Sequence, residues 1–326
     1  MTARLTKGAL ATVATPARFP FVLLRIVTSA ALLAIPAFAQ GSVLDVVDGE
    51  TLYEGGRLFS WGFELDREEV LRSGGSRLAD PNASHSYRFT STLALQYGLR
   101  NNLQIGVAVP YVVDQSESLL DETSSAGVGD LELLGKWRFY RWDARGVSIN
   151  TSLITSLSLP TGEDDRTENG LELEPDEQLG SGGIDPSFGL AITPEPGRWR
   201  FNAAILHQVR TDTDGDHDRL GSSWFAELAI GNRFWLEAYP GPFMRADVFV
   251  HWFDEARDHV GGAFVLNSGG GFSSGGERVT AGAKWAFRPR PSLDFQLSGE
   301  VPIWRDVNGP QLADDWSVQF SFGYRF

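Results

Sequence analysis

Apolar and polar residues alternate along much of this chain. From Trp316 to Phe326 every second residue is apolar or aromatic, and Ser, Gln, Gly and Arg occupy the positions between them. The segments 103–113 and 146–160 repeat the pattern. Successive side chains of a strand point to opposite faces, so this alternation predicts strands with one apolar and one polar face. The chain is therefore expected to be all-β, folded as either a sandwich or a barrel.

The same pattern, followed along the whole sequence, predicts twelve strands. Their expected ranges are 57–65, 86–98, 103–113, 128–140, 146–160, 184–194, 198–210, 222–234, 243–253, 278–288, 292–303 and 315–326. Long and short connections alternate between them; 66–85, 161–183 and 304–314 are long, whereas 99–102 and 195–197 are short. Short periplasmic turns, long extracellular loops and an even strand number are typical of transmembrane antiparallel up-and-down β-barrels. A soluble sandwich gives no reason for such alternation, so we predict the barrel.

The aromatic residues favour the same fold. Many of them lie near the ends of the apolar strand faces: Tyr97, Tyr111, Trp137, Trp199, Trp224, Trp252, Trp285, Trp316 and Tyr324. Amphipathic rings prefer the headgroup level of a bilayer, so two aromatic belts are expected. The predicted strands also supply the roughly 9–11 residues that a spanning strand needs. The opposite faces are polar and suit a hydrated lumen, so sites such as Ser152 and Ala108 are expected to face water.

Residues 1–39 have the features of a cleaved signal peptide. Basic residues precede the apolar stretch 26–35, and the small-x-small sequence that ends at Ala39 follows it. Cleavage is expected between Ala39 and Gln40, because a retained membrane anchor would need a longer apolar run. We therefore expect a protein of the bacterial cell outer membrane, with 40–56 as a short periplasmic segment and 57–326 as the barrel.

The composition excludes several function classes. The formal net charge is −14 and the chain has no cysteine. Nucleic-acid binding needs clustered basic residues, and thiol catalysis, disulfides and thiolate metal sites need cysteine. The acidic sequence 212–218 superficially resembles a calcium loop but lacks EF-hand spacing, so a hydrated loop is favoured over loose cation binding. No histidine shares a strand face with a nearby serine, so we predict no catalytic residue, no metal site and no cofactor.

Charged residues also fall on the polar strand faces, which would line the lumen. They are Arg88, Asp130, Glu132, Lys136, Arg138, Arg200, Arg210, Glu227, Arg233, Arg245, Asp247, Lys284, Asp294, Glu300 and Arg325. Basic residues outnumber acidic ones in this set, although the whole chain is acidic. Two interpretations remain open: opposite charges pair across neighbouring strands and support the barrel, or they form a constriction that filters solutes by size and charge.

Several segments resemble the outer-membrane barrels of the putative MetA-pathway phenol-degradation family, often described as transporters. The residues that carry the resemblance are 97–111, 127–139, 157–162, 180–189 and 301–312, and the likeness spans about 57–326. The resemblance implies an outer-membrane barrel through which aromatic hydrocarbons pass. It supplies no residue motif that identifies the solute.

These observations predict a channel or transporter that passes small molecules, and the resemblance extends this to aromatic or hydrophobic compounds. A twelve-stranded barrel is wider than the filled eight-stranded barrels and narrower than the open porins. The alternatives are a non-conducting structural or adhesion barrel and, less favoured, a surface hydrolase. The expected partners are outer-membrane lipid and lipopolysaccharide, the barrel-assembly machinery and a small-molecule solute. Phe326, the last residue of the alternating terminal strand, is the predicted membrane-assembly signal.

Overall fold

The computed structural model describes residues 47–119, 122–168, 171–172, 178–211, 220–260, 263–264 and 274–326. The regular secondary structure of these residues is entirely β-strand. The predicted signal peptide 1–39, its cleavage site at Ala39 and Gln40, and the acidic sequence 212–218 lie outside the described residues. In the part of the chain that is described, no helix is long and apolar enough to cross a membrane.

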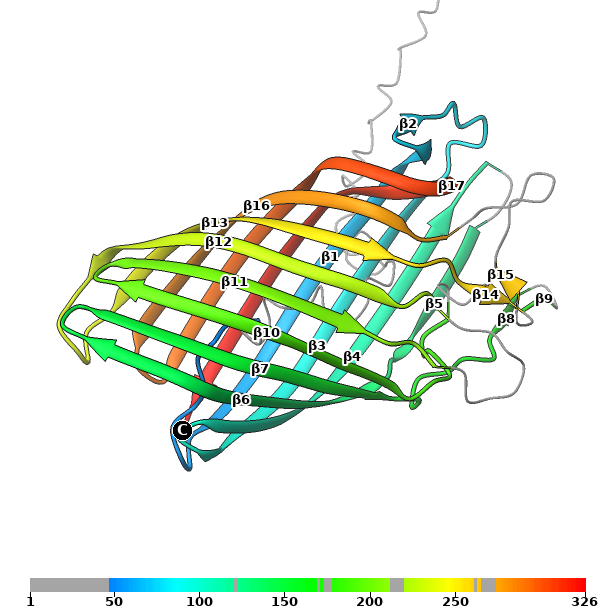
Figure 1. The fold of residues 1–326 in the computed structure, drawn as a ribbon. Coiled ribbons are helices and arrows are strands. Elements are labelled where there is room, and N and C mark those ends of the chain that lie inside the picture. The colour runs from blue at the N-terminus through cyan, green and yellow to red at the C-terminus, as the bar shows by residue number, and fades with distance from the viewer. Residues whose placement is uncertain are drawn as a thin grey trace, which may run out of the picture.

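Antiparallel strands close into a barrel (Figure 1). The ring contains β1 (Arg57–Gly74), β3 (His85–Arg100), β4 (Leu103–Glu117), β6 (Leu131–Ala144), β7 (Val147–Leu159), β10 (Asp185–Pro196), β11 (Trp199–Gln208), β12 (Ser223–Leu236), β13 (Phe243–Glu255), β16 (Gly276–Arg290) and β17 (Leu293–Arg325). Each strand pairs with its neighbour in the sequence, and β17 pairs with β1 to close the ring. The up-and-down topology predicted from the alternation is therefore confirmed.

Four short strands pair in two small hairpins outside the ring, and two more extend it at its loop end. The hairpins are β8 (Thr167–Glu168) with β9 (Leu171–Glu172), and β14 (His259–Val260) with β15 (Ala263–Phe264). The other two, β2 (Ser76–Arg77) and β5 (Glu122–Val128), pair with β1 and β4 respectively. The short turns and the C-terminus lie together at the opposite end, which is the periplasmic end.

The 33-residue strand β17 crosses the barrel wall twice. Its first part, up to Val307, pairs with β16, and its second part pairs with β1. The two parts lie side by side, because the Arg325 N–H donates to the Ser292 carbonyl at 2.8 Å and the Phe295 and Phe322 rings are 5.6 Å apart. The eleven strands of the ring therefore cross the wall twelve times, and the last two predicted strands are the two halves of β17.

Several strands run further than the apolar pattern indicates. The predicted loop 304–314 lies wholly within β17, and β1 extends through 66–74 of another predicted loop. The charged residues in these extensions pair instead of forming loops; Arg278 and Asp314, for example, form an ion pair of 2.9 Å. A hairpin that projects beyond the bilayer meets water on both faces, so it needs no apolar alternation. The strand period is therefore absent from its sequence.

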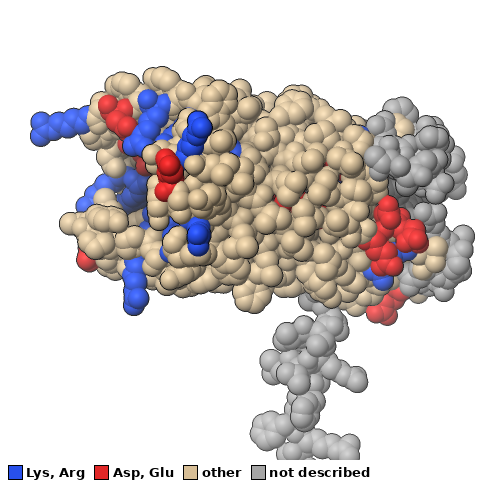
Figure 2. All heavy atoms as spheres, turned by 90° about the horizontal axis from the view of Figure 1, so that it is seen from below, with Lys and Arg blue, Asp and Glu red and all other residues tan. Residues whose placement is uncertain are grey.

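The barrel exterior is apolar. Outward side chains such as Phe188 and Leu190 are 50% and 48% exposed. Figure 2 shows a broad middle zone with few charged side chains, and charged residues gathered at the two ends. Trp199 and Tyr324 lie near the periplasmic ends of their strands, and Trp224 lies near the loop end of β12. A closed barrel leaves no unpaired edge, so this exterior suits the lipid of the outer membrane.

Replacing Leu153 with Arg tests this orientation. Leu153 lies in the middle of β7 on the outer face, paired with the exposed Leu190. An arginine that faces lipid near the bilayer centre should lower the free energy of unfolding by about 2–4 kcal/mol. Denaturant titration of the barrel refolded in lipid vesicles measures the change, with Leu153→Phe as the apolar control. Equal stability of the two variants would contradict a lipid-facing position.

Candidate functional site in the barrel interior

The inner face of the barrel holds the charged residues predicted to line the lumen, except Asp130. Those less than a tenth exposed are Arg88, Glu132, Lys136, Arg200, Arg210, Arg245 and Asp247. Those of intermediate exposure are Arg138, Glu227, Arg233, Lys284, Asp294, Glu300 and Arg325. A charge this deeply buried requires a partner, because desolvation disfavours an isolated ion.

Most of these residues are paired with an opposite charge on the same or a nearby strand. Ion pairs of 2.8 Å join Arg88 to Asp114, Arg210 to Asp185 and Arg245 to Asp247. Further pairs join Arg233 to Glu195, and Arg288 and Arg325 to Asp294. Charge pairing of this kind supports the barrel from inside. It also leaves little unbalanced charge along the wall.

Asp130 has a different role from the one predicted. The predicted strand 128–140 is broken at this residue into β5 and β6. One carboxylate oxygen of Asp130 accepts the N–H groups of Thr161 and Gly162 at 3.1 and 3.0 Å, and the other accepts the N–H and hydroxyl of Ser181 at 2.8 Å. Asp130 therefore joins the two ends of the loop between β7 and β10 instead of lining the lumen.

A histidine bridges two lumenal carboxylates. Nε2 of His251 lies 3.1 Å from Glu227, and its Nδ1 lies 2.8 Å from Glu300. The ring stacks on Phe249 at a centroid distance of 4.4 Å. These residues come from three strands, β12, β13 and β17, so the sequence alone could not show that they meet. The arrangement links neighbouring strands of the wall.

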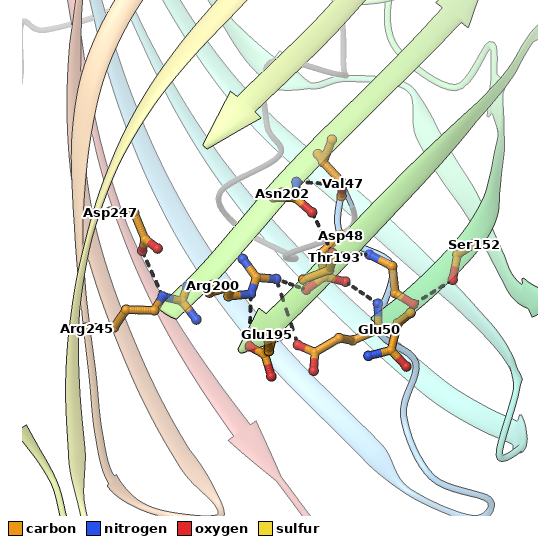
Figure 3. Close-up of polar contacts among 12 residues, drawn as sticks. Val47, Asp48, Glu50, Ser152, Thr193, Glu195, Arg200, Asn202, Arg245 and Asp247 are labelled. Atoms are coloured by element: carbon orange, nitrogen blue, oxygen red, sulfur yellow. Dashed lines mark hydrogen bonds and ion pairs between the residues drawn. The ribbon is translucent and has the colours of Figure 1, made fainter. Parts of the chain in front are cut away.

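The largest unexpected feature is the N-terminal segment, residues 47–54, which enters the barrel from the periplasmic end (Figure 3). The Asp48 side chain is 8% exposed and lies between two buried cations. Its Oδ1 accepts from Lys136 Nζ of β6 at 2.8 Å, and its Oδ2 accepts from Arg200 Nη2 of β11 at 2.7 Å. In the ring, β7 and β10 lie between these two strands. One carboxylate therefore joins distant parts of the wall.

The backbone of the N-terminal segment is also held by the wall. The Gly49 N–H donates to Thr193 Oγ1, and the Ser152 hydroxyl donates to the Gly49 carbonyl, both at 2.8 Å. The Asn202 amide donates to the Val47 carbonyl at 3.2 Å. A Cβ atom on residue 49 would collide with the carbonyl oxygen of Asn150. Only glycine lets the segment lie this close to β7.

These contacts correct the expectation that Ser152 and Ala108 face water. Ser152 is 0% exposed and holds the N-terminal segment. Ala108 is 1% exposed and packs against Ala94 and Leu134 inside the barrel. The interior at this level is filled because a terminal segment occupies it. Alternation along strands identifies inward positions but not what they contact.

An apolar cluster lies on the extracellular side of the Asp48 contacts. It consists of Val47, Ile154, Ala191, Ala204, Leu206, Phe225 and Phe253. Ile154 and Leu206 are each 1% exposed, and register places them across β10 from one another. Val47 is the contribution of the N-terminal segment to this cluster. The barrel interior therefore combines a cationic pair with a neighbouring apolar surface.

The loop end shows a smaller set of ties. The Asp258 carboxylate accepts the Gly221 N–H at 2.6 Å, and the Asp258 N–H donates to Ser274 Oγ at 2.8 Å. Burial raises the pKa of Asp258 above its ordinary value, and the Gly221 hydrogen bond opposes the shift. Among the described residues, no group of three or more His, Asp or Glu side chains is arranged to hold a metal ion.

Comparison with solved structures shows the fold of the chain. An outer membrane channel from Pseudomonas putida shares 14% identity with a TM-score of 0.62, covering 86% of this chain and 98% of that one. The beta domain of a Bordetella autotransporter has 12% identity, a TM-score of 0.45, and coverage of 84% and 100%. The autotransporter translocator domain NalP from Neisseria meningitidis has 12% identity, a TM-score of 0.43, and coverage of 89% and 96%. No curated protein has a significantly similar sequence.

The family comparison matches most of the barrel. A family model described as "Putative MetA-pathway of phenol degradation" matches residues 82–305, from the first residues before β3 to the middle of β17. This match covers more than half of the chain and agrees with the resemblance carried by the sequence segments. The chain thus belongs to the family of outer-membrane β-barrels described as the putative MetA-pathway of phenol degradation.

Proposed function

We propose that this protein is an outer-membrane channel for small solutes, closed at its periplasmic end by the N-terminal segment. Passage requires the segment to leave the barrel interior, and no covalent chemistry is involved. The observation that carries the proposal is the position of Asp48. A chain-terminal segment, rather than a strand of the wall, occupies the interior and is held there by side chains of four strands.

The barrel wall does not depend on this segment. Every strand of the ring pairs with two other strands, and β17 closes the ring onto β1 without any contribution from 47–54. A barrel with a purely structural role has no need of a separate piece inside it. A channel, in contrast, must exclude most solutes when it is not transporting, and a removable segment achieves this without rearranging the wall.

We propose aromatic or hydrophobic compounds as the solutes. The family description, which refers to phenol degradation, supports an aromatic solute. The apolar cluster supports it physically, because Ile154, Leu206 and Phe225 offer a surface inside the barrel on which an apolar ring can lie. Polar residues around it, such as Thr193 and Asn202, keep the rest of the pathway hydrated.

The proposed partners follow from the two ends and the exterior of the barrel. The apolar outer face would contact outer-membrane lipid, and lipopolysaccharide would surround the loop end. The terminal strand, ending at Phe326, would be recognised by the barrel-assembly machinery. These partners and the solute are proposals that the lipid-facing exterior and the exposed terminal residue support.

Deleting residues 47–54 tests the proposed closure. The purified full-length mature protein should show little steady conductance in a planar bilayer, because the segment fills the interior. The deletion should raise conductance at least tenfold. Gly49→Val should have the same direction of effect, since a side chain at this position collides with β7. If both variants fold and conduct no better than the unaltered protein, the segment does not close a channel, and a structural barrel is the better interpretation.

A further inference from the structure

The Asp48 carboxylate occupies a site that the barrel wall builds independently of it. Lys136 and Arg200 are 4% and 5% exposed, and both direct nitrogen atoms at the same point inside the barrel. They lie on β6 and β11, so their positions are set by the wall and not by the N-terminal segment. A fork and a point charge that converge on one carboxylate form a typical recognition site for that group.

The electrostatic balance at this site favours an anion. Within the contacts of Arg200, Glu195 lies 3.5 Å from its Nε, but Glu195 is also paired with Arg233. Glu50, the other carboxylate near Arg200 at 3.8 Å, belongs to the N-terminal segment and leaves with it. Withdrawal of the segment therefore removes negative charge from around two buried cations, and such cations strongly favour a replacement anion.

The surface beside the cationic pair is apolar. Lys136 lies in register with Ile154, which belongs to the apolar cluster together with Leu206 and Phe225. Val47 and Asp48 place an apolar side chain against this cluster and a carboxylate against the cations. The two consecutive residues thus occupy the interior as a single molecule with an apolar body and a carboxylate would.

We propose that Lys136 and Arg200 form a carboxylate-binding site for the transported solute, which is a monocarboxylate with an apolar or aromatic body. Asp48 occupies this site in the closed barrel. The solute competes with Asp48 for the two cations, and its binding favours the displaced position of the N-terminal segment. This inference rests on the proposed channel function and specifies the class of solute. It also explains closure by a carboxylate that is bound as a ligand.

Calorimetric titration of the detergent-solubilised mature protein tests the site, with sodium benzoate as the probe. Asp48→Asn removes the competing charge with little change of shape, so benzoate should bind about tenfold more tightly than to the unaltered protein. Adding Lys136→Gln and Arg200→Gln to this variant should abolish the gain. Glu54→Gln is the matched control, because it removes one charge from an exposed position of the same segment.

Two further probes separate the parts of the site. Acetate should bind more weakly than benzoate, since it cannot cover the apolar cluster, and benzyl alcohol should show no gain from Asp48→Asn. Benzoate binding that does not depend on Lys136 and Arg200, or an equal gain for benzyl alcohol, would overturn the proposal. Planar-bilayer conductance of the same variants is read separately. A conducting Asp48→Asn barrel that binds no benzoate refutes the carboxylate site alone, whereas failure of all folded variants to conduct refutes the channel.

Discussion

Replacing Asp48 with Arg is expected to hold the barrel open. The substitution would place a third cation between Lys136 and Arg200, where both side chains are buried and only 2.8 and 2.7 Å from the present carboxylate. Breaking a buried ion pair costs about 3–5 kcal/mol, and a factor of ten in an equilibrium constant corresponds to about 1.4 kcal/mol. The inserted position of the N-terminal segment should therefore lose at least a hundredfold in population. Single-channel recordings should show mostly open barrels.

Charge exchange tests whether this effect arises at the proposed contact. In an Asp48→Arg barrel, the additional change Arg200→Asp restores one opposite-charge pair and should recover part of the closed population. Glu54→Arg makes the same charge reversal at an exposed position of the segment and should leave the barrel closed. Closed recordings from a folded Asp48→Arg barrel would show that Asp48 does not hold the segment. An open Glu54→Arg barrel would point instead to the overall charge of the segment.

The barrel could be predicted from the sequence because its wall obeys a strict physical rule. Lipid outside and polar groups inside force alternation on every spanning segment, and this periodicity can be read in one dimension. The rule stops at the membrane boundary. Residues 304–314 form strand without alternation, since water surrounds both faces of the hairpin. The break at Asp130 was missed for a related reason, because the pattern continues on each side of it while its carboxylate binds loop residues.

The site could be predicted only in part. Lys136 and Arg200 fall on the polar faces of their strands, so their inward orientation follows from the period. That they converge on one point depends on the register of β6, β7, β10 and β11, which a single sequence does not contain. The N-terminal segment carries no pattern at all. It is a short stretch without periodicity, and its position depends on side chains 88 to 152 residues away in the sequence.

Loss of Phe326 should remove the protein from the outer membrane. In the finished barrel, Phe326 contributes little to stability, because its side chain is 52% exposed and contacts mainly Tyr324 and Arg57. Its backbone exchanges two hydrogen bonds with Arg57, at 3.1 and 3.2 Å, where the first and last strands meet. A residue exposed in the product but expected to be an assembly signal should act on delivery. Phe326→Asp is therefore expected to reduce the folded protein in outer-membrane fractions by at least tenfold.

The same variant refolded from denaturant into detergent should behave almost normally. Its backbone hydrogen bonds to Arg57 are retained, and an exposed substitution changes the free energy of unfolding by only about 0.5 kcal/mol. Phe326→Tyr keeps an aromatic terminus and should reach the membrane in cells. The contrast between cellular assembly and refolding distinguishes the two roles that a terminal aromatic residue could have. Normal outer-membrane levels of Phe326→Asp would eliminate the signal, whereas failure to refold in detergent would assign Phe326 to closing the seam between β1 and β17.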